Sequence, residues 1–149
     1  MSHGNVFVMT DLRMAKVTPD LVGALNTRGE DFARKIGHPD TLPKVFIYDV
    51  KEKSGRELQC DATCFSEGQQ HHSLPGSGAM ALGAFLTVRG HLPLPEKSRN
   101  AKTIFYFTHP SGKLTARVHL SRGNPHWEIH ATSFDTPVRL LMHGSLITR

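Results

Sequence analysis

A Gly-Ser-Gly sequence stands directly in front of a long apolar run. Residues 74–81 read LPGSGAMA, and the apolar run continues to Gly90. Glycine lets the backbone turn tightly, and the first amides of a helix lack intrahelical partners and lie at its positive dipole end. The pattern predicts a helix whose start can hold a carboxylate or phosphate. It also fits a helix start with a serine cap and no ligand.

Two histidine-containing segments could add ligand contacts. His71 and His72 precede the glycines, and neighbouring residues of an extended segment point in opposite directions, so at most one of them faces a ligand. The sequence HPSG at 109–112 offers His109 and Ser111, but it is also an ordinary turn in which Gly112 can adopt a positive φ. Lys113, which follows, either attracts anions or is simply solvated.

Four residues could in principle bind zinc: Cys60, Cys64, His126 and His130. Each pair falls on a predicted strand, where four positions span about 13 Å, too far for two ligands of one ion. We therefore expect no metal site, and expect both cysteines to be small core residues.

Composition indicates a soluble globular chain forming one domain over residues 1–149. Hydrophobic residues make up 38% and charged residues 21%, and no segment has the roughly 18 consecutive apolar residues of a membrane span. The N-terminus lacks a secretion signal, and two cysteines do not form a disulfide framework, so we expect a cytoplasmic location. The net charge of +5 favours a negatively charged partner. Nucleic acid is disfavoured, because the basic residues are scattered and no recognition motif is present.

Apolar periodicity and turn residues predict the elements. Residues 6–9 are predicted to form a buried strand, and 18–20 to open a first helix with proline in its first turn. Residues 27–30 have capping-box spacing for a second helix that carries Phe32 and Ile36 on one face and ends at Gly37 and Pro39.

Alternating segments predict antiparallel hairpins. Strands 44–50 and 58–64 flank one turn, strands 104–107 and 114–120 flank another, and a strand at 127–131 and a short element at 138–147 follow. The fold class expected is α+β, with an antiparallel sheet or half-barrel wrapped around the central apolar helix at 79–88.

Several of these segments together resemble the C-terminal half of the PrpF family. They are GNVFV at 4–8, KVFI at 44–47, HHSLPGSGAM at 71–80, HPSGKL at 109–114 and RLLMHG at 139–144. Val6 stands where the family has proline. The family comprises cofactor-independent isomerases of unsaturated di- and tricarboxylates, related in fold to diaminopimelate epimerase.

The resemblance implies one half of a two-half isomerase. In the family each half is a sheet around a central helix, and the active site lies in the cleft between the halves. The proposed proton-transferring residues lie largely in the other half, so the catalytic residues here are unknown. Pro75 occupies the position where the epimerase relatives have a catalytic cysteine, which argues against a two-thiol racemase.

The expected function is cis–trans or double-bond-shift isomerisation of aconitate-like acids by proton abstraction without a cofactor, performed by an isomerase of this kind or by a half-length derivative of one. The amides of Ser77, Gly78 and Ala79 would stabilise charge developing on a substrate carboxylate. The alternative is a non-catalytic polycarboxylate-binding or assembly module that pairs with itself or with a complementary half-chain. The predicted substrate-binding residues are Asn5, His72, Gly76, Ser77, Gly78, Ala79, His109, Ser111 and Gly112.

Overall fold

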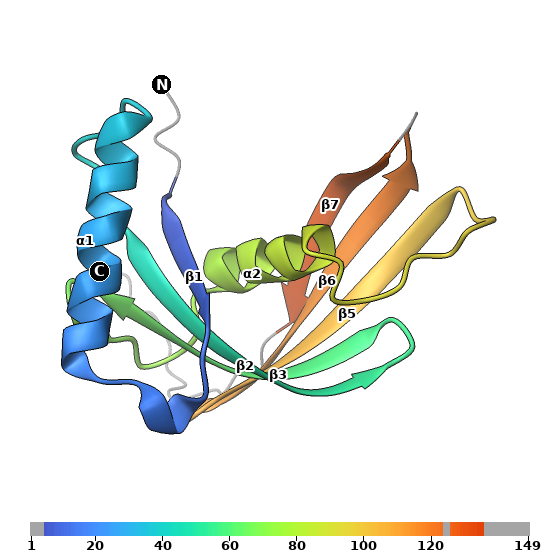
Figure 1. The fold of residues 1–149 in the computed structure, drawn as a ribbon. Coiled ribbons are helices and arrows are strands. Elements are labelled where there is room, and N and C mark those ends of the chain that lie inside the picture. Colours follow the sequence, from blue (N-terminus) through green and yellow to red (C-terminus); the bar gives the residue numbers. More distant parts are fainter. Residues whose placement is uncertain (1–4, 124–125, 136–149) are drawn as a thin grey trace, which may run out of the picture.

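A curled mixed sheet with two helices forms an α+β half-barrel (Figure 1). The computed structural model describes residues 5–123 and 126–135, so the element predicted at 138–147 lies outside the described residues. In sheet order the strands are β1 (Phe7–Asp11), β2 (Lys44–Ser54), β3 (Glu57–Ser66), β5 (Asn100–His109), β6 (Gly112–Arg122) and β7 (Trp127–Asp135). A short β4 (Gln69–Gln70) pairs with the end of β3.

The prediction of an antiparallel sheet is wrong in part. Both predicted hairpins, β2 with β3 and β5 with β6, are antiparallel, as is the pairing of β6 with β7. However, β1 pairs with β2 and β3 pairs with β5 in parallel. A helix lies in the chain between the two strands of each parallel pair, and such a crossover is long enough to return the chain in the same direction.

The prediction of two N-terminal helices is also wrong. After a short 3-10 turn (η1, Met14–Lys16), a single helix α1 runs from Pro19 to Lys35. It begins as predicted, with Thr18 as its N-cap and proline at its start. Thr27 does not cap a second helix, because its hydroxyl donates to the Gly23 carbonyl one turn earlier (3.1 Å). Gly37, at φ +82°, ends the helix as predicted.

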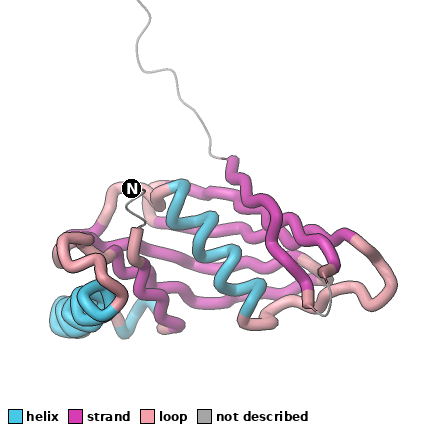
Figure 2. Tube along the Cα trace, turned by 90° about the horizontal axis from the view of Figure 1, so that it is seen from above, coloured by secondary structure: helices cyan, strands magenta, loops and turns pink. Residues whose placement is uncertain are grey.

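The two helices lie on opposite faces of the sheet. Val22 and Leu25 of α1 pack against Val45 and Ile47, whose side chains project to the outer, convex face of β2. Helix α2 (Gly76–Val88) lies across the strands on the concave face, where it contacts β5, β6, β7 and β1 (Figure 2). Its buried side chains join the inward residues of β2, β3, β5 and β6 in the main core.

Two glycines let α2 approach the sheet closely. A β-carbon at Gly78 would lie 2.0 Å from Cζ of Phe46, and one at Gly83 would lie 3.1 Å from Cδ2 of Phe105. Both aromatic rings are fully buried. Gly78 is therefore required by packing against the sheet, whereas the sequence pattern had suggested a need only for a tight turn.

One face of α2 is left uncovered by the part of the chain that the structure describes. Ser77, Met80, Ala81, Ala84 and Val88 recur at helical spacing and are partly or fully exposed, with Val88 at 77%. We call this stripe the open face of α2. In the described ranges, no helix has both the length and the apolar character needed to cross a bilayer.

Substitution of Gly78 by alanine tests the close approach. The added methyl group would collide with the ring of Phe46, so we expect Gly78→Ala to lower the free energy of unfolding by about 1–3 kcal/mol. Gly23→Ala is the matched control, because a β-carbon there meets nothing within 4 Å and alanine favours a helix over glycine. It should stabilise the protein by up to about 1 kcal/mol. Equal stability of Gly78→Ala and wild type in denaturant titrations would contradict close packing of Gly78 on the Phe46 ring.

Candidate functional site

A pocket lies where the start of α2 meets the turn between β5 and β6. Its volume is about 660 Å³, within the range of small-molecule sites. The loop that leads into α2, the turn itself and one residue of β7 form its walls. The lining residues are His72, Ser73, Leu74, Pro75, Gly76, His109, Ser111, Gly112, Lys113, Leu114 and Phe134.

The structure brings five of the nine predicted binding residues to this pocket: His72, Gly76, His109, Ser111 and Gly112. The other four do not line it. Asn5 is exposed before β1, Ser77 is exposed on the first turn of α2, and Gly78 and Ala79 are buried on the side of that turn that faces the sheet.

The first turn of α2 leaves fewer amides free than the sequence suggested. The N-cap is Pro75, and no side chain caps the helix, so Ser77 is not the cap. The Ala79 amide donates to the Pro75 carbonyl (2.9 Å) and is therefore not available to a ligand. The amides of Gly76, Ser77 and Gly78 belong to the first turn, which has no intrahelical acceptors.

Phe134 forms a wall over the helix start that the sequence did not predict. A β-carbon at Gly76 would lie 2.4 Å from Cζ of this ring, so glycine is needed here for close packing. Phe134 itself remains 40% exposed. The alternation that begins at Trp127 and Ile129 would turn Phe134 to the opposite face of the sheet. One extra residue of β7, at the register shift between His119 and Leu120, returns Phe134 to the α2 side opposite Ala116, so alternation in the sequence gives no sign of this contact.

His109 is held by the turn that follows it. Its Nδ1 accepts from the Ser111 backbone amide (3.1 Å) and lies 2.8 Å from the Ser111 hydroxyl. An amide can only donate, so Nδ1 carries a lone pair and a neutral ring has its proton on Nε2. The amide and the hydroxyl of Ser111, a predicted ligand contact, are therefore already engaged by His109.

The environment of His109 favours its neutral form. Burial lowers the pKa of this imidazole, the backbone of His71 opposes the shift, and the positive charge of a protonated His71 reinforces it. His109 is 6% exposed, and its Nε2 has no partner with hydrogen-bond geometry among the described residues, the His71 backbone included. In this state His109 is a poor general base, because Nε2 is protonated and Nδ1 is occupied.

The two adjacent histidines have different surroundings. The ring of His71 lies 2.7 Å from the Ser66 hydroxyl through Nε2, and its amide donates to the Cys64 carbonyl (2.8 Å). His72 is exposed and lines the pocket. With Lys113, His72 is one of the two exposed basic side chains in the lining, and none of the described lining residues carries a carboxylate. The pocket thus favours an anionic ligand.

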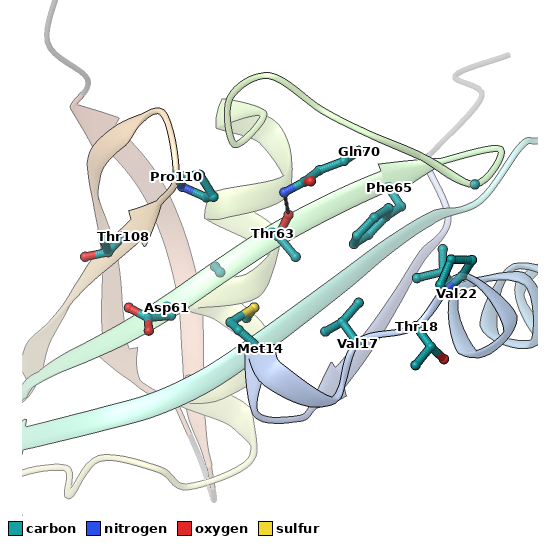
Figure 3. A pocket seen from close by; sticks show the side chains of 13 residues that line it. Met14, Val17, Thr18, Val22, Asp61, Thr63, Phe65, Gln70, Thr108 and Pro110 are labelled. Carbon is teal, nitrogen blue, oxygen red and sulfur yellow. Dashed lines mark hydrogen bonds between the residues drawn. The ribbon is translucent and has the colours of Figure 1, made fainter.

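A different pocket on the convex face has the opposite character (Figure 3). Met14, Val17 and Phe65 supply an apolar surface, while Asp61 contributes a carboxylate. The amide of Gln70 donates to the Thr63 hydroxyl across it (2.8 Å). None of the predicted binding residues lines this pocket, and its carboxylate disfavours an acidic ligand.

The cysteines belong to the core, as the sequence predicted. Cys60 and Cys64 are at most 1% exposed, and burial raises the pKa of each thiol to about 12. Their side chains face α2 with the rest of the main core. His130 instead lies on the surface of β7, with its ring 6.1 Å from that of His119. The thiols are therefore neither ready bases nor joined to these histidines.

Comparison with known proteins gives one distant relative. The chain is 29% identical over 94 residues to a protein of Shewanella oneidensis named 2-methyl-aconitate isomerase. The match covers 63% of this chain and only 24% of the relative, so the chain spans about a quarter of that protein's length. No protein-family model matches the chain.

Proposed function

We propose that the pocket at the start of α2 binds a carboxylate group, and that the chain forms the anion-binding part of a cofactor-independent isomerase of aconitate-like acids. The observation that carries this proposal is the meeting of the helix start with the turn at 109–112 in one pocket whose described lining has basic side chains and no acidic one. The name of the distant relative supports the same class of substrate.

The proposed reaction needs stabilisation of negative charge more than it needs a cofactor. A base removes a proton from the carbon next to the double bond, and the electron pair spreads over the conjugated system to a carboxylate. Return of a proton at the other end of that system moves the double bond and leaves the composition unchanged. The start of α2, where Gly76 lines the pocket, would stabilise the carboxylate as its charge grows.

Among the described residues, the buried titratable groups near the pocket are unsuited to act as the base. The buried thiols remain protonated, and His109 is tied to Ser111. Exposed His72 and Lys113 are the remaining titratable groups of the pocket. A complete site would then draw on one of these two groups, or on a surface that packs beside the pocket.

The open face of α2 favours a second candidate function, a binding or assembly module. An apolar stripe on a helix that is otherwise enclosed by sheet is a surface suited to association. A second copy of this chain or a complementary half-chain could cover it. In this case the pocket binds the acid without completing the reaction.

Deuterium exchange separates the two functions. In deuterated buffer, we expect a dimer of this chain to introduce deuterium into the methylene carbon of cis- or trans-aconitate, followed by proton NMR, with light scattering giving the mass. Acid binding without exchange would favour the module. The isomerase proposal fails if neither the monomer nor the dimer exchanges protons, and both candidate functions fail if the protein does not bind aconitate.

Lys113 should contribute to affinity for the acid. We expect Lys113→Gln to weaken cis-aconitate binding about two- to fivefold at low salt, the effect of removing one exposed charge near an anion. Lys35→Gln makes the same charge change at the end of α1 and should leave the affinity unchanged. Equal calorimetric affinities of Lys113→Gln and wild type in low and high salt would place the ligand elsewhere.

The buried ring of His109 should make stability depend on pH. Since its folded pKa lies below the ordinary 6.5, the unfolded chain takes up this proton first as the pH falls. The stability that the neutral ring contributes is complete above pH 6.5 and is lost as the pH falls through the folded value. The difference in unfolding free energy between wild type and His109→Gln should therefore shrink from about pH 7.5 to about pH 5.

His91, whose pKa burial also lowers, is present in both proteins and cancels in this difference. His71, His72 and Lys113, the other titratable groups beside or lining the pocket, are likewise unchanged. A difference that grows as the pH falls would show that His109 is stabilised in its charged form instead.

A further inference from the structure

The convex face of the sheet carries a second group of basic residues, far along the strands from the turn at 109–112. Arg56, Lys102, His119 and His130 line one groove, with Ser54, Gly55, Glu57, Asn100, Ala101, Ile104 and Leu120. The four basic residues come from the β2–β3 turn, β5, β6 and β7. Inward neighbours of Lys102, such as Ala101 and Thr103, are buried on the α2 side, so Lys102 projects away from α2.

Three of these residues form a row across adjacent strands. Lys102 and His119 are direct register partners in the antiparallel pair β5 and β6. The ring of His119 lies 6.1 Å, centroid to centroid, from the ring of His130 on β7. Across the strand pair Lys102 thus faces an imidazole and not a carboxylate, and among the described ion pairs none neutralises its charge.

A β-bulge lies at His130 in this row. On β6 the register passes from His119, which pairs with Ala131, to Leu120, which pairs with Ile129, so His130 is the extra residue of β7. His130 follows Ile129, which packs toward the core, so alternation turns its side chain to the outer face, and the extra residue leaves both His130 and Ala131 exposed there beside His119. Bulges re-aim side chains and occur often beside functional sites.

The charge of the groove determines what it can bind. In the described part of the chain, neither Arg56 nor Lys102 forms an ion pair, and Glu57 is the one carboxylate among the lining residues. Two imidazoles alone could hold a zinc ion, but the fixed charges of Arg56 and Lys102 oppose a cation. The described residues also contain no group of three or more metal-ligating side chains.

We propose that this groove binds a phosphate group, either inorganic phosphate or the phosphate of a small molecule. The Arg56 guanidinium suits the oxygens of a phosphate as a planar fork of donors, and Lys102 adds a point charge. The imidazoles of His119 and His130 donate from the adjoining strands. The groove is on the face opposite α2, so the proposal does not depend on the isomerase function.

Titration with inorganic phosphate tests the proposal on the full chain. NMR resonances of Arg56, Lys102, His119 and His130 should shift together and saturate. Lys102→Gln and His130→Gln should each weaken the affinity about two- to fivefold, and the double variant about tenfold. All of these side chains except His119 are exposed, so the variants should fold as the wild type does. Lys35→Gln is the control for the charge change and should have no effect.

Three outcomes would overturn the proposal. One is the absence of saturable shifts at these residues, and another is unchanged affinity in the double variant. The third is tighter binding of Zn²⁺ or of a short DNA duplex than of phosphate, each lost in the double variant, which would identify the groove as a metal or nucleic-acid site. Comparison of inorganic phosphate with a sugar phosphate in the same titration then distinguishes a free ion from a phosphorylated small molecule.

Discussion

The contact between Gly78 and the ring of Phe46 is the constraint on which the position of the candidate site depends. A missing β-carbon allows the first turn of α2 to lie directly on a fully buried ring, which also packs edge-on against Phe7 with centroids 5.6 Å apart. Gly83 repeats the arrangement on Phe105, one and a half turns later. The depth of α2 in the half-barrel is therefore set by aromatic rings of the sheet. That depth in turn decides which amides of the helix reach the pocket and which are enclosed.

The parallel strand pairs explain why three distant segments meet at this pocket. Helix α2 connects β3 to β5 as a crossover, so β5 runs alongside β3 and ends at His109. The turn to β6 brings the chain back, and β7 returns once more to place Phe134 over Gly76. If β5 ran antiparallel to β3, the end of β5 would lie at the other end of the strands, away from the start of α2. The mixed topology is thus a requirement for the pocket, since it aligns the end of β5 with the start of α2.

Local patterns predicted much of the fold but not its long-range pairings. Period-two alternation and glycine turns predicted both hairpins and β7, and apolar content predicted α2. These signals act within a few residues of the chain. The parallel pairings of β1 with β2 and of β3 with β5 were not predicted, because the alternation of inward and outward side chains along a strand does not reveal which strand pairs with it. The capping-box pattern at 27–30 misled because a threonine hydroxyl can also donate to the carbonyl one turn back, as Thr27 does.

Glycines 76 and 78 were assigned to anion binding, while the structure shows packing reasons for both. The rings that need these glycines come from residues 58 and 32 positions away in the sequence, where no local signal could reveal them.

Binding and proton transfer have different physical requirements, and the described residues meet them unequally. Under the proposed function, holding a carboxylate needs free amides and positive potential, for which the pocket has the first turn of α2 and the exposed Lys113. Abstracting a proton needs an accessible lone pair, and the enclosed groups lack one: burial keeps both thiols protonated, and Ser111 occupies the free nitrogen of His109.

The open face of α2 begins at Ser77, immediately beside the pocket, and continues to Val88. A surface that covered this stripe would also reach the mouth of the pocket. Association there would exclude water from the helix start and strengthen its electrostatic effect on a bound carboxylate. Assembly and chemistry are therefore coupled through the same helix face under the proposed function.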